Sequence, residues 1–146
     1  PRNLDDEQLQ WVKESGGVVQ TVALAAFVNK EKAAAYKKAK DSILKIDPKA
    51  SLETIKKSTP PVNVSDFVDH IDYIKNKIGI DHVGISSDFD GGGGIEGWRD
   101  ASQTYNITLE LVRRGYSEQE IGKIWSGNLL RVLDRTQEVA KELQGN

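Results

Sequence analysis

The sequence contains no cysteine, no methionine and only two histidines. Without cysteine there can be no disulfide bond, no thiolate nucleophile and no cysteine-ligated zinc. It also lacks a long hydrophobic run: residues 18–28 form the longest, Gln20 and Thr21 interrupt it, and a membrane helix needs about 20 apolar residues. The 20 basic and 22 acidic side chains nearly balance, which gives no long-range attraction for nucleic acid.

The composition that remains is that of a globular domain. Hydrophobic residues make up 38% and charged residues 29% of the 146 positions, which excludes a disordered chain and allows one domain without an internal boundary. The opening residues, Pro1-Arg2-Asn3-Leu4, include neither a starting methionine nor the apolar stretch of a secretory signal. We therefore expect the sequence to come from the interior of a longer chain.

Hydrophobic patterning predicts strands that alternate with helices. A short helix begins at the acidic residues 5–7, and a β-branched run at 18–24 is typical of a buried parallel strand. Ser65 then caps a helix with an apolar stripe, Gly79 ends it, and residues 80–87 form a second strand. Only helices are expected after that: one over residues 104–114, one that begins at a capping box over residues 117–120, and a terminal helix that follows residues 127–133. This order predicts an α/β fold with parallel strands and helical crossovers.

Residues 29–58 form a lysine-rich helical segment. It holds nine lysines against four acidic residues. Such a run is most often a solvated helix face, and it can also serve as a lid.

The most informative chemistry follows the second predicted strand, where Asp88-Phe89-Asp90 leads into four glycines, Gly91 to Gly94. In α/β proteins, functional groups lie at the carboxyl ends of strands. Asp88 is therefore a candidate general acid/base or metal ligand, and a capping role for its carboxylate stays open.

Two motif matches and a lone histidine do not meet their structural conditions. Residues 92–97 fit G-x-G-x-x-G, but a dinucleotide site needs a strand and an acidic residue downstream, where only helices are predicted. His70-Ile71-Asp72 fits an H-x-D metal pair, but on a helix the two side chains diverge. His82 lies at the entry end of its strand. Neither histidine is expected to bind metal.

Several separate stretches together resemble the membrane (renal) dipeptidase family, zinc-dependent peptidase family M19 of the amidohydrolase-like barrels. The most specific are D-F-D-G at residues 88–91 and G-N-L-L-R-V at residues 127–132. The others lie at residues 2–6, 16–20, 68–74, 79–85 and 114–117. Their order covers the full length of the chain.

The resemblance implies that residues 1–146 are the C-terminal portion of a (β/α)8 TIM barrel, about its last two strands and their helices. It implies hydrolysis of dipeptides with two zinc ions, whose protein ligands would all precede Pro1. The chain alone would then be inactive and would hold no metal of its own. The expected partners are a dipeptide and the N-terminal part of the barrel; a homodimer is also compatible with the resemblance.

The same resemblance assigns roles to three residues. Asp88 matches the acid that shuttles a proton to the leaving amine, Arg2 matches the arginine that holds the free carboxylate of the dipeptide, and Gly91 shapes the wall near the substrate. The segment from Lys30 to Lys57 would lie on the active-site face, with no residue assigned. Two alternatives remain: a metal-free barrel that binds a peptide or serves a structural role, and a nucleotide-binding domain that uses residues 92–97.

Overall fold

The computed structural model of this chain describes residues 3–145. The first helix, α1 (Asp6–Glu14), begins where the acidic residues predicted it. The Asp5 carboxylate accepts a hydrogen bond from the Gln8 backbone N–H at 2.9 Å, and the Gln8 side chain accepts from the Asp5 N–H at 3.0 Å. This capping box satisfies two backbone donors at the helix start.

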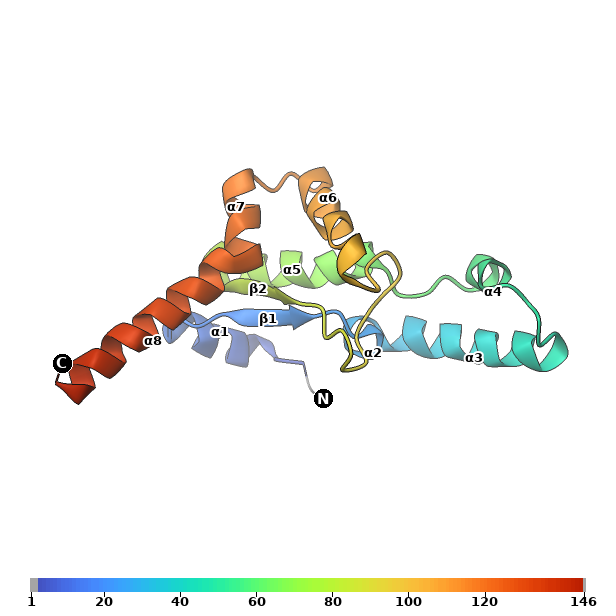
Figure 1. The fold of residues 1–146 in the computed structure, drawn as a ribbon, viewed down its shortest axis with the longest axis horizontal. Helices are drawn as coiled ribbons and strands as arrows, with labels where there is room; N and C mark the ends of the chain where they lie inside the picture. The colour runs from blue at the N-terminus through green and yellow to red at the C-terminus, as the bar shows by residue number, and fades with distance from the viewer. Residues whose placement is uncertain (1–2, 146) are drawn as a thin grey trace. The chain divides into compact units, whose positions relative to one another are not determined.

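Two short strands, β1 (Val19–Val22) and β2 (Val83–Ser86), pair in one sheet (Figure 1). Gly17 and His82, which precede the strands, are joined by a 2.8 Å contact between the carbonyl oxygen and Nδ1. Further along, the Gln20 side chain lies against Gly84. Because residue numbers rise together along both strands, the strands are parallel, as predicted.

Both strands are shorter than predicted. The run at residues 18–24 forms a strand only over β1, and α2 (Ala25–Val28) follows. At the second strand, Ile80–His82 form the 3-10 turn η1 instead of extended chain. Gly79 has a φ of +99°, which turns the chain as it leaves the preceding helix.

Three helices follow α2 before β2: α3 (Lys30–Ile46), α4 (Leu52–Ser58) and α5 (Val64–Ile78). The cap of α5 differs from the prediction, because Asn63 rather than Ser65 performs it. The Asn63 Oδ1 accepts from the Asp66 backbone N–H at 3.2 Å, and Asp66 Oδ2 accepts from the Asn63 N–H at 2.8 Å.

After β2 the chain forms the 3-10 turn η2 (Ala101–Gln103) and then α6 (Tyr105–Arg113), α7 (Glu118–Gly122), a π-helical turn η3 (Lys123–Gly127) and α8 (Asn128–Gln144). β2 is the last strand of residues 3–145, as the sequence predicted. The predicted capping box at the start of α7 is present, since Ser117 and Glu120 exchange hydrogen bonds.

The chain divides into two compact units, each with its own buried apolar residues. One unit contains residues 3–21, 69–86 and 111–145, and its core consists of Leu9, Ile71, Ile74, Ile78, Val83, Leu111, Tyr116 and Ile124. The other contains residues 22–68 and 87–110, with a core of Ala23, Val28, Ile55, Val62, Phe67, Val68, Ile95, Trp98 and Ile107.

A helix that spans a bilayer needs about 20 predominantly apolar residues. Within residues 3–145, no helix is both long enough and apolar enough to span one.

Candidate active site

Asp88 lies two residues beyond the carboxyl end of β2, where the sequence predicted functional chemistry. Its side chain is half-buried, and its backbone has a φ of +53°. Left-handed backbone is uncommon for residues other than glycine. The Asp88 carbonyl accepts hydrogen bonds from the N–H groups of Gly93 at 2.8 Å and Gly91 at 3.2 Å. These bonds close a tight turn around the carboxylate.

Gly91 and Gly93 contact Asp88 in different ways. A methyl group on Gly91 would overlap the Asp88 Oδ1 atom, the end of a side chain that can move. A methyl group on Gly93 would overlap the carbonyl oxygen of Ser87 and lie 2.6 Å from that of Asp88. The absence of a side chain at residue 91 therefore makes room for the Asp88 carboxylate. At residue 93 the same absence makes room for the backbone of residues 87 and 88.

The glycine-rich loop is anchored beyond these residues. The Gly94 N–H donates to the carbonyl of Ala23, the first residue after β1, at 2.9 Å. The Glu96 N–H donates to Val62 at 2.9 Å, and the Val64 N–H donates to Glu96 at 3.2 Å. These backbone bonds fix the loop to two other segments of its own unit.

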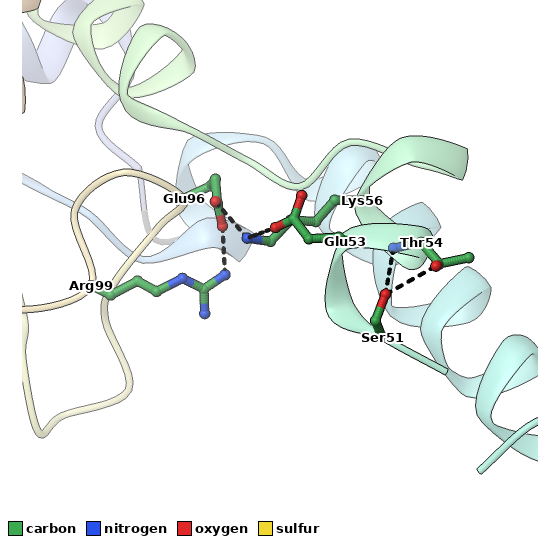
Figure 2. A network of polar contacts seen from close by, with 6 residues as sticks. All are labelled: Ser51, Glu53, Thr54, Lys56, Glu96 and Arg99. Atoms are coloured by element: carbon green, nitrogen blue, oxygen red, sulfur yellow. Dashed lines mark hydrogen bonds and ion pairs between the residues drawn. The ribbon is translucent and has the colours of Figure 1, made fainter. Parts of the chain in front are cut away.

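Glu96 also forms a cluster of charged contacts (Figure 2). Its carboxylate accepts from Lys56 Nζ and from the Arg99 guanidinium, each at 2.7 Å. Burial disfavours the charged carboxylate, but the hydrogen bonds from Lys56 and Arg99 outweigh it and lower the pKa of Glu96. The hydrogen bond to Glu96 raises the pKa of Lys56. Both groups therefore remain ionised near neutral pH.

The lysine-rich segment is mostly a solvated surface. No residue of α3 is buried, while α4 places the fully buried Ile55 in the core. Two of its lysines have specific partners: Lys56 binds Glu96, and Lys32 Nζ lies 2.6 Å from the Asp66 carboxylate. These two pairs hold the segment within its unit.

The H-x-D residues lie on helix α5, as predicted, and are not arranged as a metal pair. His70 is half-buried there, and the Asp72 carboxylate accepts from Arg114 at 2.6 Å and from the Tyr116 hydroxyl at 2.5 Å. His82 Nδ1 contacts the Gly17 carbonyl. Among residues 3–145, no group of three or more His, Asp or Glu side chains is arranged to hold a metal ion.

The G-N-L-L-R-V block proves to be structural. Asn128 is buried, and its Nδ2 donates to the carbonyls of Ile80 at 2.7 Å and Val83 at 2.8 Å. Arg131 donates to the carbonyls of Gly16 and Asp81, each at 2.8 Å. The block therefore fixes the segments that enter the two strands.

The structure describes two of the three predicted site residues. The structure brings Asp88 and Gly91 together, whereas Arg2 lies outside the described residues. Sequence reasoning missed Glu96 and Trp98, which follow the glycine-rich loop and whose contacts depend on how the chain folds there. The one signal nearby in the sequence is the run of four glycines, because glycine permits close backbone approach.

Comparison with known proteins identifies relatives over the whole chain. Residues 1–146 match the family described as membrane dipeptidase, peptidase family M19. Dipeptidase aclJ of Aspergillus oryzae is 32% identical over 143 residues, and dipeptidase ataJ of Aspergillus terreus is 36% identical over 143 residues. These alignments cover 97% and 96% of this chain and 28% of each relative. The chain thus spans little more than a quarter of the length of these curated relatives.

Solved structures give the same result. The probable dipeptidase PvdM from Pseudomonas aeruginosa is 36% identical and superimposes with a TM-score of 0.68, covering 89% of this chain and 40% of PvdM. A metallo peptidase from Rhodobacter sphaeroides, liganded with a phosphinate mimic of L-Ala-D-Ala, shares the fold with a TM-score of 0.68 at 24% identity. That alignment covers 92% of this chain and 32% of the peptidase.

The mixed α/β fold agrees with these dipeptidase structures, and the family match extends from the first residue to the last. The chain belongs to the membrane dipeptidase family, peptidase family M19.

Proposed function

We propose that this chain is the C-terminal portion of a (β/α)8 barrel that hydrolyses dipeptides. The observation that carries the proposal is the position of Asp88, held in a left-handed turn just beyond β2 with Gly91 against its carboxylate. Barrel enzymes place their catalytic groups in the loops that follow the strands. The two parallel strands and the relatives that are named dipeptidases support this assignment.

In this proposal Asp88 moves a proton during hydrolysis. Breaking a peptide bond requires removal of a proton from the attacking water and delivery of a proton to the leaving nitrogen. A carboxylate can do both in turn, first as a base and then as an acid. Asp88 is only half-buried, so part of its surface is accessible to a small substrate.

Arg2 and Gly91 would act on the substrate. Arg2 would bind the free C-terminal carboxylate of the dipeptide, since a guanidinium makes two parallel hydrogen bonds to a carboxylate. Gly91 would form part of the wall beside the scissile bond.

We further propose that two zinc ions serve the complete site and that their ligands come from polypeptide preceding Pro1. Zinc would supply Lewis acidity to the reaction. A metal-free barrel that binds a peptide is the alternative, and metal analysis with a dipeptidase assay separates the two. A complete polypeptide with bound zinc and turnover supports the enzyme; well under one zinc per chain and no turnover support the binding module.

The substrate assignment has its own test. The complete polypeptide should hydrolyse dipeptides with a free C-terminal carboxylate and should hydrolyse the corresponding C-terminal amides poorly. Arg2→Lys keeps the charge but loses the paired hydrogen bonds, so KM for the free dipeptide should rise. Equal hydrolysis of amide and acid by the wild type would exclude the proposed role of Arg2.

A further inference from the structure

Residues 95–99 form a fixed turn beyond the glycine-rich loop. The Ile95 N–H donates to the Trp98 carbonyl at 3.1 Å, and the Trp98 N–H donates to the Ile95 carbonyl at 3.0 Å. Both side chains are 2% exposed. We call this segment the 95–99 turn, and its buried side chains anchor it in the core of its unit.

The Glu96 cluster holds one side of the 95–99 turn (Figure 2). The Glu96 carboxylate binds Lys56 of α4 and also Arg99, at the far end of the turn. With the backbone bonds of Glu96 to residues 62 and 64, these contacts leave the turn little freedom to shift.

Trp98 occupies the other side of the turn and connects it to Asp88. Its Nε1–H donates to Thr104 Oγ1 at 3.1 Å, and its ring lies 5.6 Å from the Phe67 ring. A third contact joins it to Phe89, with ring centroids 5.5 Å apart and planes at 72°. Such edge-to-face pairs are favourable and directional. Phe89 is the residue directly after Asp88.

We propose that Trp98 is a positioning residue for Asp88, acting through the ring of Phe89. The inference rests on the proposed role of Asp88 in proton transfer. Left-handed backbone at a φ of +53° is sparsely populated for residues other than glycine, so contacts around Asp88 help to keep it there. The glycine N–H groups hold the Asp88 carbonyl from one side, and the Phe89 ring, fixed against Trp98, holds the chain from the other.

Two substitutions test this in the complete polypeptide. Trp98→Leu removes the aromatic surface under Phe89, so kcat for a dipeptide should fall about 10²-fold, the typical cost of displacing a catalytic group by about 1 Å, while KM changes little. Trp98→Phe retains an aromatic ring and should restore most of kcat. A kcat of Trp98→Leu close to wild type would overturn the inference.

A matched control separates positioning from loss of stability. Tyr116 is a buried aromatic residue of the other unit, and Tyr116→Phe removes its hydrogen bond to Asp72. This variant should lower the melting temperature and leave kcat unchanged. If kcat instead falls with melting temperature in the same proportion for Trp98→Leu and Tyr116→Phe, Trp98 has only a structural role.

The double variant Trp98→Leu/Asp88→Asn shows whether Trp98 acts through Asp88. If it does, Trp98→Leu causes no further loss of kcat once Asp88 is replaced, because residues that act as a unit are not additive. If the fold losses in kcat of the two single variants multiply in the double variant, the inference is contradicted and the proposed function is left intact. A wild-type kcat for Asp88→Asn alone would instead contradict the proposed function.

Discussion

At the scale of single residues, the Asp88 loop contains two glycines whose replacement should have different consequences. Gly91 faces the movable Asp88 carboxylate, and Gly93 faces the backbone of residues 87 and 88. Neither glycine has a positive φ, so alanine is compatible with the local backbone at both positions. Steric overlap alone then decides each outcome.

We predict that Gly91→Ala displaces the Asp88 carboxylate and lowers kcat by about 10- to 100-fold, with a free energy of unfolding within about 0.5 kcal/mol of wild type. Gly93→Ala should lower both kcat and the free energy of unfolding, the latter by about 1–3 kcal/mol, because the backbone atoms that the new methyl group meets cannot move aside. Urea unfolding and initial-rate assays measure both effects.

Gly122→Ala is the control, since a methyl group there meets no atom within 4 Å and the residue lies in helix α7. It should leave kcat unchanged. Equal effects of the Gly91 and Gly93 substitutions on kcat and stability would contradict the distinction.

The residue scale also marks where sequence reasoning reached its limit. Asp88 was predictable because its position after a strand is visible in the sequence. Trp98 was not, because its contact with Phe89 depends on the turn that Glu96 holds. The cap of α5 was misplaced for a similar reason: serine and asparagine both cap helices, and only the fold places Asn63 opposite Asp66.

At the scale of elements, ion pairs connect helix α5 to the segments that follow α6. Lys75 Nζ lies 2.7 Å from the Glu120 carboxylate and 4.0 Å from the centre of the Tyr116 ring. The Lys75 hydrogen bond, together with the Ser117 backbone N–H, lowers the pKa of Glu120 from 4.5 to about 2. Burial, with the hydrogen bond to Asp72, raises the pKa of Tyr116.

The lowered pKa of Glu120 predicts how the stability of the fold depends on pH. Because the carboxyl pKa is lower in the folded state, this contribution is complete above pH 4.5 and is lost as the pH falls toward 2. Glu120→Gln retains a side chain suited to the capping box with Ser117 but removes the charge. Its melting temperature should therefore fall less than that of the wild type between pH 5 and 2, an interval that runs from above the ordinary pKa of 4.5 down to the folded-state pKa of about 2.

Glu118→Gln is the control, because it removes a carboxylate from the same helix without touching Lys75. It should keep the wild-type acid dependence. An identical acid dependence for wild type and Glu120→Gln would show that the Lys75 pair contributes nothing to stability.

The elements themselves were largely predictable. Hydrophobic periodicity located α1, α5, α6 and both strands, and the Ser117–Glu120 spacing located the start of α7. Strand ends were the main error: Ile80-Asp81-His82 directly precede the apolar residues that begin β2, and the prediction extended the strand over them. Gly79 and the contact of His82 with Gly17 instead favour a 3-10 turn there.

At the scale of the whole molecule, two parallel strands cannot close a barrel, and barrels typically need about 250 residues. The alignments agree with this, since the chain covers 28% of its curated relatives and 40% of PvdM. In the proposed function the activity belongs to a longer polypeptide, in which this chain would supply an acid and an arginine.

This assignment predicts that residues 1–146 in isolation bind no zinc and do not hydrolyse dipeptides, whereas the complete polypeptide does both. Circular dichroism should accompany the assay, so that the comparison is made with a helical sample. Turnover by the isolated segment would show that the placement of the metal ligands before Pro1 is wrong.

The central claim is that Asp88 carries the proton. Its most direct test is kcat for a dipeptide in the complete polypeptide with Asp88→Asn, compared with Asp90→Asn. Asp90 is a suitable control because it lies in the same loop, is exposed and also has a positive φ, of 64°. General acid–base catalysis contributes about 10²- to 10⁴-fold, so Asp88→Asn should lower kcat by that amount while Asp90→Asn stays near wild type. A near-wild-type kcat for Asp88→Asn would contradict the account.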